Sequence, residues 1–171
     1  MNQISDLDLS YIAGVIDCDG SIIAQFVYHK DYRPERPYEI RLTIQISQLK
    51  KRRWWLDKFV DIIGEGTVRD RPLPKDPKKH ISAMSDYVLV GVRPVGELLK
   101  QLRPFFKSKN KQADLIIRIT EQLAHSNDPA IYDQILDLVD QASNNNDSKK
   151  RTITAEVVRD RMRQGLNESS L

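Results

Sequence analysis

The chain has little cysteine and histidine and no long apolar segment. Its 171 residues include one cysteine, Cys18, and three histidines. A single cysteine excludes an intrachain disulfide framework and a zinc site built from cysteine thiolates. No apolar run approaches the roughly 20 residues that span a bilayer, and the N-terminal MNQISDLD is neither a signal peptide nor an arginine-rich transit peptide. We therefore expect a soluble protein with no membrane partner that works where it is made.

Charge is nearly balanced, which limits what composition alone can indicate. Lys and Arg number 27 against 24 Asp and Glu, for a formal net charge of +3. A net charge this small does not by itself predict nucleic-acid binding, which requires that the basic residues cluster. With 40% hydrophobic residues, a chain of this length can bury roughly 70% of its unfolded surface. We expect one domain over residues 1–171, with a disordered tail at 165–171.

Hydrophobic periodicity predicts an α+β fold. Leu9, Ile12, Ala13 and Ile16 form one apolar stripe at helical spacing, and Gly20 follows where that helix would end. After this helix the pattern predicts strands at 21–30 and 38–48, a helix at 50–63, strands at 66–71 and 85–92, and helices at 95–106, 109–124, 130–142 and 155–164. Four antiparallel strands backed by helices on one face would bury the apolar sides of both.

Two acids stand at an unfavourable place in the opening helix. Asp17 and Asp19 lie at its C-terminal end, where the helix dipole is negative and the last carbonyls lack helical partners. Gly14, in the middle of the helix, costs about 1 kcal/mol relative to alanine. An Asp before Gly20 is also common in ordinary turns, so the pattern alone leaves a structural and a functional role open for Asp19.

The predicted sheet has one polar face. In the strand at 38–48, Ile40, Leu42, Ile44 and Ile46 face one way, whereas Glu39, Arg41, Thr43, Gln45 and Ser47 face the other. The exposed face would hold Gln25, His29, Arg41, Thr43, Gln45, Arg69 and Arg71. On this pattern alone, a polar sheet face is as often simply exposed to solvent as used for binding. Here it carries Arg and Gln, which read base edges, and basic segments at 50–53, 75–79, 107–111 and 149–151 flank the strands.

The motif at residues 12–20 carries a family resemblance. IAGVIDCDG resembles the LAGLIDADG motif of homing endonucleases. In the same order along the chain, SIIAQF, KKRRWWLDKFVDIIG, VRDR, SDY, LKQLRPFFKSKNKQA and NDSKKR resemble the single-motif branch of organellar introns, especially those of algal chloroplasts. The resemblance implies an αββαββα subunit that forms a homodimer, binds double-stranded DNA and uses Mg²⁺ or Mn²⁺.

The resemblance also implies a role for particular residues. Asp19 would bind the metal together with the backbone carbonyl of Cys18, because a thiol is too soft a ligand for Mg²⁺. Gln48 would orient solvent, and Arg52 and Lys109 would surround the attacking water and the phosphate charge. The motif helices of two subunits would pack through Tyr11, Ile12, Ala13, Gly14 and Asp17. We interpret Asp17 as structural, with hydrogen bonds near the partner's helix end.

A larger set of residues is expected to contact DNA. These residues are Ser21, Gln25, His29, Tyr32, Glu39, Arg41, Gln45, Arg69, Arg71, Asp86, Lys107, Asp147, Ser148, Lys149, Lys150 and Arg151. We interpret His80 and His125 as ordinary surface residues. The loop at 72–84 is longer than in similar sequences, so no contact is transferred to it.

The predicted function is a double-strand break with short 3′ overhangs in a long pseudo-palindromic DNA site, which promotes intron homing in a chloroplast or mitochondrion. No small-molecule substrate is expected. Two alternatives stay open: an inactive relative that acts as an RNA maturase or transcription regulator, and a structural nucleic-acid binder that uses only the basic sheet. The presence of Asp19, Gln48, Arg52 and Lys109 together favours the nuclease.

Overall fold

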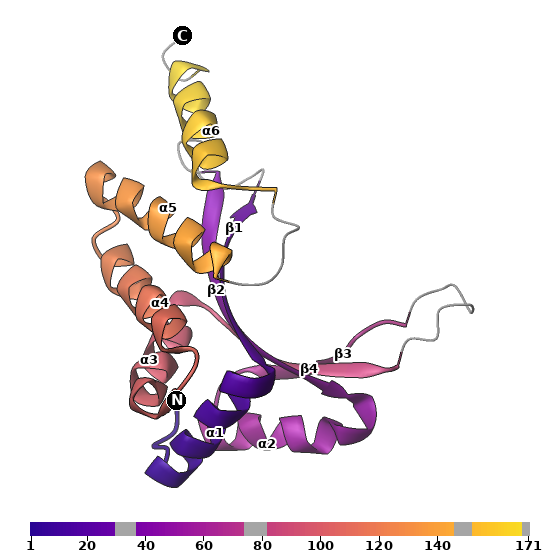
Figure 1. Cartoon of the computed structure of the whole chain (residues 1–171). Coiled ribbons are helices and arrows are strands. Elements are labelled where there is room, and N and C mark those ends of the chain that lie inside the picture. Colours follow the sequence, from indigo (N-terminus) through magenta and orange to yellow (C-terminus); the bar gives the residue numbers. More distant parts are fainter. Residues whose placement is uncertain (30–36, 74–81, 146–151, 169–171) are drawn as a thin grey trace.

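The computed structural model describes residues 1–29, 37–73, 82–145 and 152–168, with side chains up to residue 164 in the last range (Figure 1). Along the chain the elements are α1 (Asp6–Asp19), β1 (Gly20–Tyr28), β2 (Tyr38–Leu49), α2 (Arg53–Ile63), β3 (Thr67–Asp70), β4 (Met84–Val90), α3 (Val92–Leu102), α4 (Asn110–Leu123), α5 (Pro129–Asn144) and α6 (Ala155–Glu168). Single 3₁₀ turns at Lys50–Arg52 and Arg103–Phe105 precede α2 and follow α3. The predicted αββαββα order with additional C-terminal helices is confirmed.

The four strands form one antiparallel sheet in the order β1-β2-β4-β3. Figure 1 shows the sheet as strongly curved, with α3, α4 and α5 gathered along one side of it. The predicted alternation in β2 is confirmed, because Ile40, Leu42, Ile44 and Ile46 are all buried in the core between the sheet and the helices. The opposite face carries the predicted polar row.

Helix ends follow the local sequence. Ser5 caps α1 by accepting a hydrogen bond from the backbone N–H of Asp8. Gly64 ends α2 in the left-handed conformation, with φ of 76°, as a C-terminal glycine does. Thr154 caps α6, since its hydroxyl accepts from the backbone N–H of Val157 at 3.4 Å.

Side chains from α4 and α5 cover the outer edge of β1. Gln112, which is buried, donates from Nε2 to the carbonyls of Ile22 at 2.8 Å and Ala142 at 2.9 Å. The hydroxyl of Ser143 donates to the carbonyl of Ala24 at 2.8 Å. Because β1 is an edge strand, these bonds occupy carbonyls that could otherwise recruit another strand.

The C-terminal helix is longer than the sequence predicted. α6 continues to Glu168, beyond the predicted helix end at residue 164, and residues 169–171 lie outside the described residues. Arg159 holds α6 to α5 by donating to Asp133 at 2.6 Å and Asp137 at 2.8 Å. None of the helices within the described ranges is long and apolar enough to cross a membrane.

Candidate active site

Three predicted catalytic residues meet where α1, β2 and α2 converge. Nε2 of Gln48, near the end of β2, donates to Oδ2 of Asp19 at 3.2 Å. Nη1 of Arg52, just before α2, donates to Oε1 of Gln48 at 3.3 Å. Because the amide oxygen of Gln48 accepts from Arg52, its NH₂ group is directed at the Asp19 carboxylate. Asp19 is 29 residues from Gln48 in the sequence, and the fold brings the two side chains into contact.

Lys109 reaches the same helix end through Asp17. Its ammonium donates to the backbone carbonyl of Asp17 at 2.7 Å. The fourth predicted catalytic residue therefore contacts α1 at Asp17, two positions along the chain from Asp19. Lys109 also supplies a hydrogen-bond donor to a carbonyl in the last turn of α1, where helical donors are missing.

The carboxylate of Asp17 is held by its own subunit. Its Oδ2 accepts from the backbone N–H of Lys107 at 2.7 Å and of Ser108 at 3.3 Å, and its Oδ1 accepts from the N–H of Lys109 at 2.9 Å and the Ser108 hydroxyl at 3.0 Å. These groups immediately precede α4, so Asp17 sits at the positive end of another helix. The structural interpretation of Asp17 is confirmed. The expected bond near a partner's helix end stays a prediction, because the structure describes a single subunit.

These contacts also set the ionisation of Asp17. Partial burial by itself would raise the pKa of the carboxyl, but the N–H groups of residues 107–109 and the Ser108 hydroxyl outweigh it. They hold the pKa of Asp17 below its usual value of 3.8. The charge that was unfavourable for α1 is thus stabilised by the start of α4.

The exposed side of α1 differs from the predicted interface. Ile12 and Ala13 are 0% exposed and pack in the core of their own subunit, so the prediction that they meet a partner is wrong. Gly14 and Tyr11 are on the solvent side, and a Cβ added to Gly14 would meet nothing within 4 Å. Tyr11 accepts a hydrogen bond from Nε1 of Trp55. Within one subunit, packing therefore gives no reason for a glycine at position 14.

Two oxygen groups at the end of α1 are suitable ligands for a hard divalent cation. Asp19 offers an exposed carboxylate, and the carbonyl of Cys18 belongs to the last turn of α1, where helical donors are missing. Among the described residues, no cluster of three or more His, Cys, Asp or Glu side chains could hold a metal ion. Mg²⁺ commonly binds through one or two carboxylates plus waters and phosphate oxygens, so an oxygen-only pair of this kind suits it.

The polar sheet face holds the predicted DNA-contacting residues in cross-strand pairs. Ser21 faces Gln45 and Gln25 faces Arg41 across β1 and β2, and Arg69 faces Asp86 across β3 and β4. Ser21, Gln25 and Arg69 are exposed, whereas Arg41 and Gln45 are half-buried. Such pairs set neighbouring side chains about 5 Å apart. Long polar side chains in this register can reach adjacent base edges.

Arg71 and Asp86 form an ion pair on this face. Nε of Arg71 donates to Oδ2 of Asp86, and Nη2 donates to Oδ1, each at 2.6 Å. Ser47, which the prediction missed as a contributor, donates to Oδ1 of Asp86 at 2.6 Å and accepts from Arg71 at 2.7 Å. Its position in the alternating row of β2 was the available signal. The guanidinium of Arg71 is thereby fixed in one orientation.

Asp86 is only 2% exposed, which contradicts the prediction that it contacts DNA. Its carboxylate instead positions Arg71. Burial alone would raise the pKa of its carboxyl, but the bonds from Arg71 and Ser47 outweigh burial and lower the pKa. The negative charge is therefore kept, and with it the orientation of Arg71.

At the far end of β2, Glu39 lies between two nitrogen groups. Nε2 of His29 is 2.8 Å from Oε2 of Glu39, and Nη2 of Arg41 donates to the same oxygen at 3.1 Å. Burial would raise the pKa of Glu39, but His29 and Arg41 outweigh it and lower that pKa. The predicted DNA-contacting residues at this end thus form one cluster.

The remaining predictions concern the edges of the site. The side chain of Lys107 is exposed beside Asp17, and His125 is an exposed residue after α4, as interpreted. Tyr32, His80 and the segment from Asp147 to Arg151 lie outside the described residues. Their predicted roles are therefore untested.

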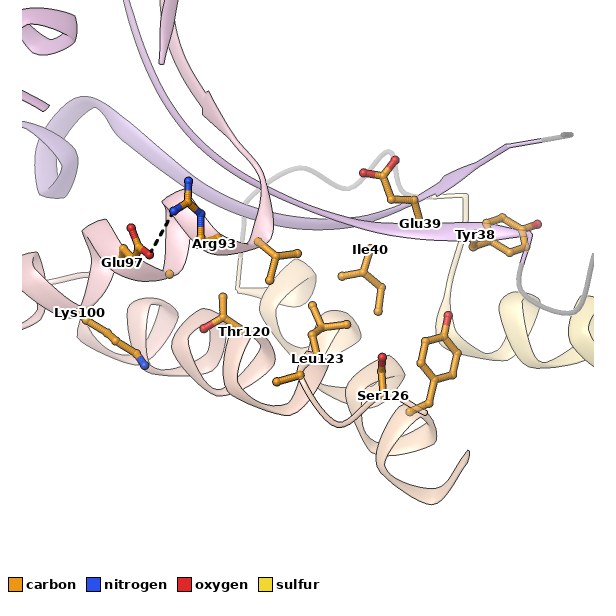
Figure 2. A pocket seen from close by; sticks show the side chains of 13 residues that line it. Tyr38, Glu39, Ile40, Arg93, Glu97, Lys100, Thr120, Leu123 and Ser126 are labelled. Atoms are coloured by element: carbon orange, nitrogen blue, oxygen red, sulfur yellow. Dashed lines mark ion pairs between the residues drawn. The ribbon is translucent and has the colours of Figure 1, made fainter. Parts of the chain in front are cut away.

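A pocket of about 690 Å³ lies away from this site, between the start of β2 and helices α3 and α4. Figure 2 shows Arg93 paired with Glu97 beside it and Thr120 and Leu123 facing it from α4. The predicted catalytic residues are not among those that line it, which include Tyr38, Ile40, Lys100 and Tyr132. Asp19, which is exposed, is not part of this pocket.

Comparison with known proteins gives two similar curated sequences. The chain is 43% identical over 152 residues to the DNA endonuclease I-CreI of Chlamydomonas reinhardtii, covering 88% of this chain and 86% of that protein. It is 33% identical over 159 residues to the DNA endonuclease I-CvuI of Chlorella vulgaris, covering 93% and 92%. No family model matches the chain.

A solved structure shares the fold over the same length. The crystal structure of the homing endonuclease I-CvuI in complex with its target, in the presence of calcium, gives a TM-score of 0.80 at 31% identity and covers 93% of this chain and 94% of that one. A second structure of I-CvuI, bound to the I-CreI target in the presence of magnesium with the DNA not cleaved, gives the same values. By sequence and by fold, this chain belongs to the single-motif LAGLIDADG homing endonucleases.

Proposed function

We propose that the chain is a subunit of a sequence-specific, metal-dependent DNA endonuclease. The observation that carries this proposal is the contact chain from Arg52 through Gln48 to Asp19, with Lys109 at the same helix end. It lies at the end of a sheet whose exposed face carries paired Arg and Gln side chains. A protein that only bound DNA would need the sheet, but it would not need an exposed carboxylate held by an oriented amide.

The protein's own residues would act on the phosphodiester in three ways. Asp19 and the Cys18 carbonyl would hold a divalent cation, which supplies a lowered pKa for bound water and charge neutralisation at the leaving oxygen. The NH₂ group of Gln48 would fix the Asp19 carboxylate. Arg52 and Lys109 would stabilise the negative charge that develops on the phosphate in the transition state.

A homodimer is part of the proposal because one chain supplies one Asp19. Cutting both strands requires a carboxylate for each scissile phosphate, and a twofold axis supplies the second copy. Leu7, Tyr11, Gly14 and Cys18 form an exposed stripe with steps of four, three and four residues along α1, and Leu7 is 81% exposed. Trp54 of α2 is also exposed. Gly14, which its own subunit does not require, would let the two α1 helices approach closely.

The finer features follow from this architecture and from the relatives. A twofold protein fits a long pseudo-palindromic site, and we propose that it leaves short 3′ overhangs and promotes intron homing. An organellar location, in a chloroplast or mitochondrion, is the corresponding proposal for where it acts, since the two curated relatives come from algae.

The test is selection of cleaved sequences from a randomised duplex library in Mg²⁺, followed by sedimentation analysis of the protein alone. We expect one enriched site with approximate twofold symmetry and a dimer in solution. Binding of a preferred duplex or RNA without cleavage in Mg²⁺ or Mn²⁺ would instead favour the inactive regulator or maturase. A stable monomer that still makes double-strand breaks would contradict the proposed assembly.

A further inference from the structure

The DNA-facing side of the sheet is not uniformly polar. Ile23 of β1 faces Thr43 of β2, and Thr43 faces Val90 of β4, so the three side chains form one row across the sheet. Val88 lies on the same face of β4, opposite Gln45. We call Ile23, Thr43, Val88 and Val90 the apolar strip. The sequence prediction missed it because only the polar members of each strand were considered.

The apolar strip is separate from the hydrophobic core. Among the described residues, Ile23 and Val88 belong neither to the core cluster between sheet and helices nor to the side chains packed against it. Val88 and Thr43 are nevertheless only 6% and 7% exposed. Val90 is 49% exposed. The strip thus presents a small apolar surface, and Val90 is its most accessible member.

Charged and polar side chains border the strip on both sides. Gln25 and Arg41 form the pair beyond Ile23 and Thr43, while Gln45 and Arg69 lie toward the active-site end. Under the proposed function these bordering residues lie against base edges in a major groove, so the strip faces the same groove between them. The apolar group that B-DNA presents there is the C5 methyl of thymine.

We infer that the apolar strip reads the C5 methyl of a thymine in the target, with Val90 as its main contact; this inference rests on the proposed function. Thr43 lies five residues before Gln48 on β2, a distance of about 17 Å at ~3.4 Å per residue. Base pairs also rise about 3.4 Å, so the thymine lies about four to six base-pair steps outward from the cleaved phosphate. Arg and Gln beside the strip cannot make this contact, since a methyl group offers no hydrogen bond.

The experiment uses the full chain and the duplex recovered by library selection. Each thymine in turn is replaced by deoxyuridine, which removes only the C5 methyl, and affinity is measured by gel shift in Ca²⁺. The parent should lose about fourfold in affinity at one position of each half-site. Val90→Thr, which replaces one of the two methyls with a hydroxyl of similar size, should reduce the difference in affinity between thymine and uracil at that position. Val157→Thr, the same change at an exposed valine on α6, should keep the parental fourfold difference.

Several outcomes would overturn the inference. They are a parent that tolerates every uracil, a selected target without thymine at the stated distance, and a Val90→Thr protein that keeps the parental difference. A Val90→Thr protein with an altered sedimentation coefficient in the absence of DNA would assign the strip to a protein interface. Failure of the library selection to return any bound or cleaved sequence would instead refute the proposed function. Val90→Ala is a second variant. It should also reduce the difference in affinity between thymine and uracil duplexes, and its melting temperature should equal that of the parent.

Discussion

Two regions at the end of α1 use the same residue type in opposite ways. Asp17 faces the start of α4, where residues 107–109 and the Ser108 hydroxyl occupy both of its carboxylate oxygens. Asp19 faces the end of β2, where Gln48 donates one hydrogen bond to one of its oxygens. A carboxylate that its own chain satisfies stabilises the fold. A carboxylate that its chain only orients retains lone pairs for a ligand.

The same contrast recurs on the sheet. Arg71 is bound by Asp86 and Ser47. Arg69, two residues earlier, pairs with β4 through its backbone, and within the part of the chain that the structure describes its side chain has no ion-pair or hydrogen-bond partner. We expect substitution of the satisfied member of each pair to affect stability, and substitution of the open member to affect DNA cleavage or recognition.

The largest effect is expected for Asp19→Asn. The amide keeps the shape of the side chain but removes the negative charge that a divalent cation requires. Loss of an outer-shell partner of a metal commonly costs about 10–100-fold, so loss of the ligand itself should lower cleavage in Mg²⁺ by more than about 100-fold. Gel-shift affinity in Ca²⁺ and the sedimentation coefficient should be unchanged.

The melting temperature of Asp19→Asn without metal should hold or rise, because the substitution removes a negative charge from a negative helix end. The parent protein assayed on the same duplex is the control. If Asp19→Asn cut DNA at near the parental rate, Asp19 would not be a catalytic residue, and its role would not differ from that of Asp17.

A smaller effect on cleavage is expected for Gln48→Leu. Leucine fills similar space but cannot donate to Asp19 or accept from Arg52, so both contacts are lost together. Cleavage should fall by about 10–100-fold in single-turnover assays, while affinity in Ca²⁺ and thermal stability hold. Equal cleavage by parent and mutant would mean that the amide does not orient the carboxylate.

Sequence patterns were sufficient for the elements and for part of the site. The alternation of β2 and the helical stripe of α1 depend on local periodicity, so they are visible in any stretch of a dozen residues. The meeting of Asp19 with Gln48 and Arg52 came from the family motif, since nothing local relates residues 29 positions apart. The structure confirmed that meeting.

Contacts between distant segments were beyond the patterns. Asp17 and Lys107 are separated by 90 positions, and only the folded position of the segment before α4, against the end of α1, reveals them as partners. Ile12 and Ala13 were assigned both to the apolar stripe and to an interface, and tertiary packing put them wholly in the core. Asp86 was predicted as a DNA contact from its place in the set of expected DNA-binding residues, whereas hydrogen bonds from Arg71 and Ser47 make its burial tolerable.

Arg71→Ala and Arg69→Ala test the contrast on the sheet. Removing Arg71 leaves the buried Asp86 carboxylate without its cation, so the free energy of unfolding should fall by about 1–3 kcal/mol. Arg69→Ala should stay within about 0.5 kcal/mol of the parent in urea unfolding. Both should change base preference at one position of each half-site, by about 1–3 kcal/mol in competition binding.

Lys109→Ala is the control for base reading, because its proposed partner is phosphate. It should weaken binding to all sequences alike and lower the salt dependence of affinity. If the arginine variants also weakened every site equally, with the same salt dependence as Lys109→Ala, neither arginine would read a base.

The smallest effect is expected for Asp17→Asn. The amide oxygen can still accept from part of the 107–109 segment, but the charge at the start of α4 is lost, which should cost about 1 kcal/mol of stability. For a chain of this size, the melting temperature should fall by about 2–4 °C. Cleavage at temperatures where both proteins are folded should stay near the parental rate, in contrast to Asp19→Asn.

The pH dependence of this difference separates charge from shape. Because folding lowers the pKa of Asp17 below 3.8, the unfolded chain binds the proton more readily than the folded one. The stabilisation by Asp17 is therefore fully present well above pH 3.8 and is lost as the pH falls through the lowered folded-state pKa. Melting curves of parent and Asp17→Asn should differ at pH 7 and converge in that acidic range. A difference that persisted unchanged at low pH would mean that the side chain's shape, and not its charge, joins α1 to α4.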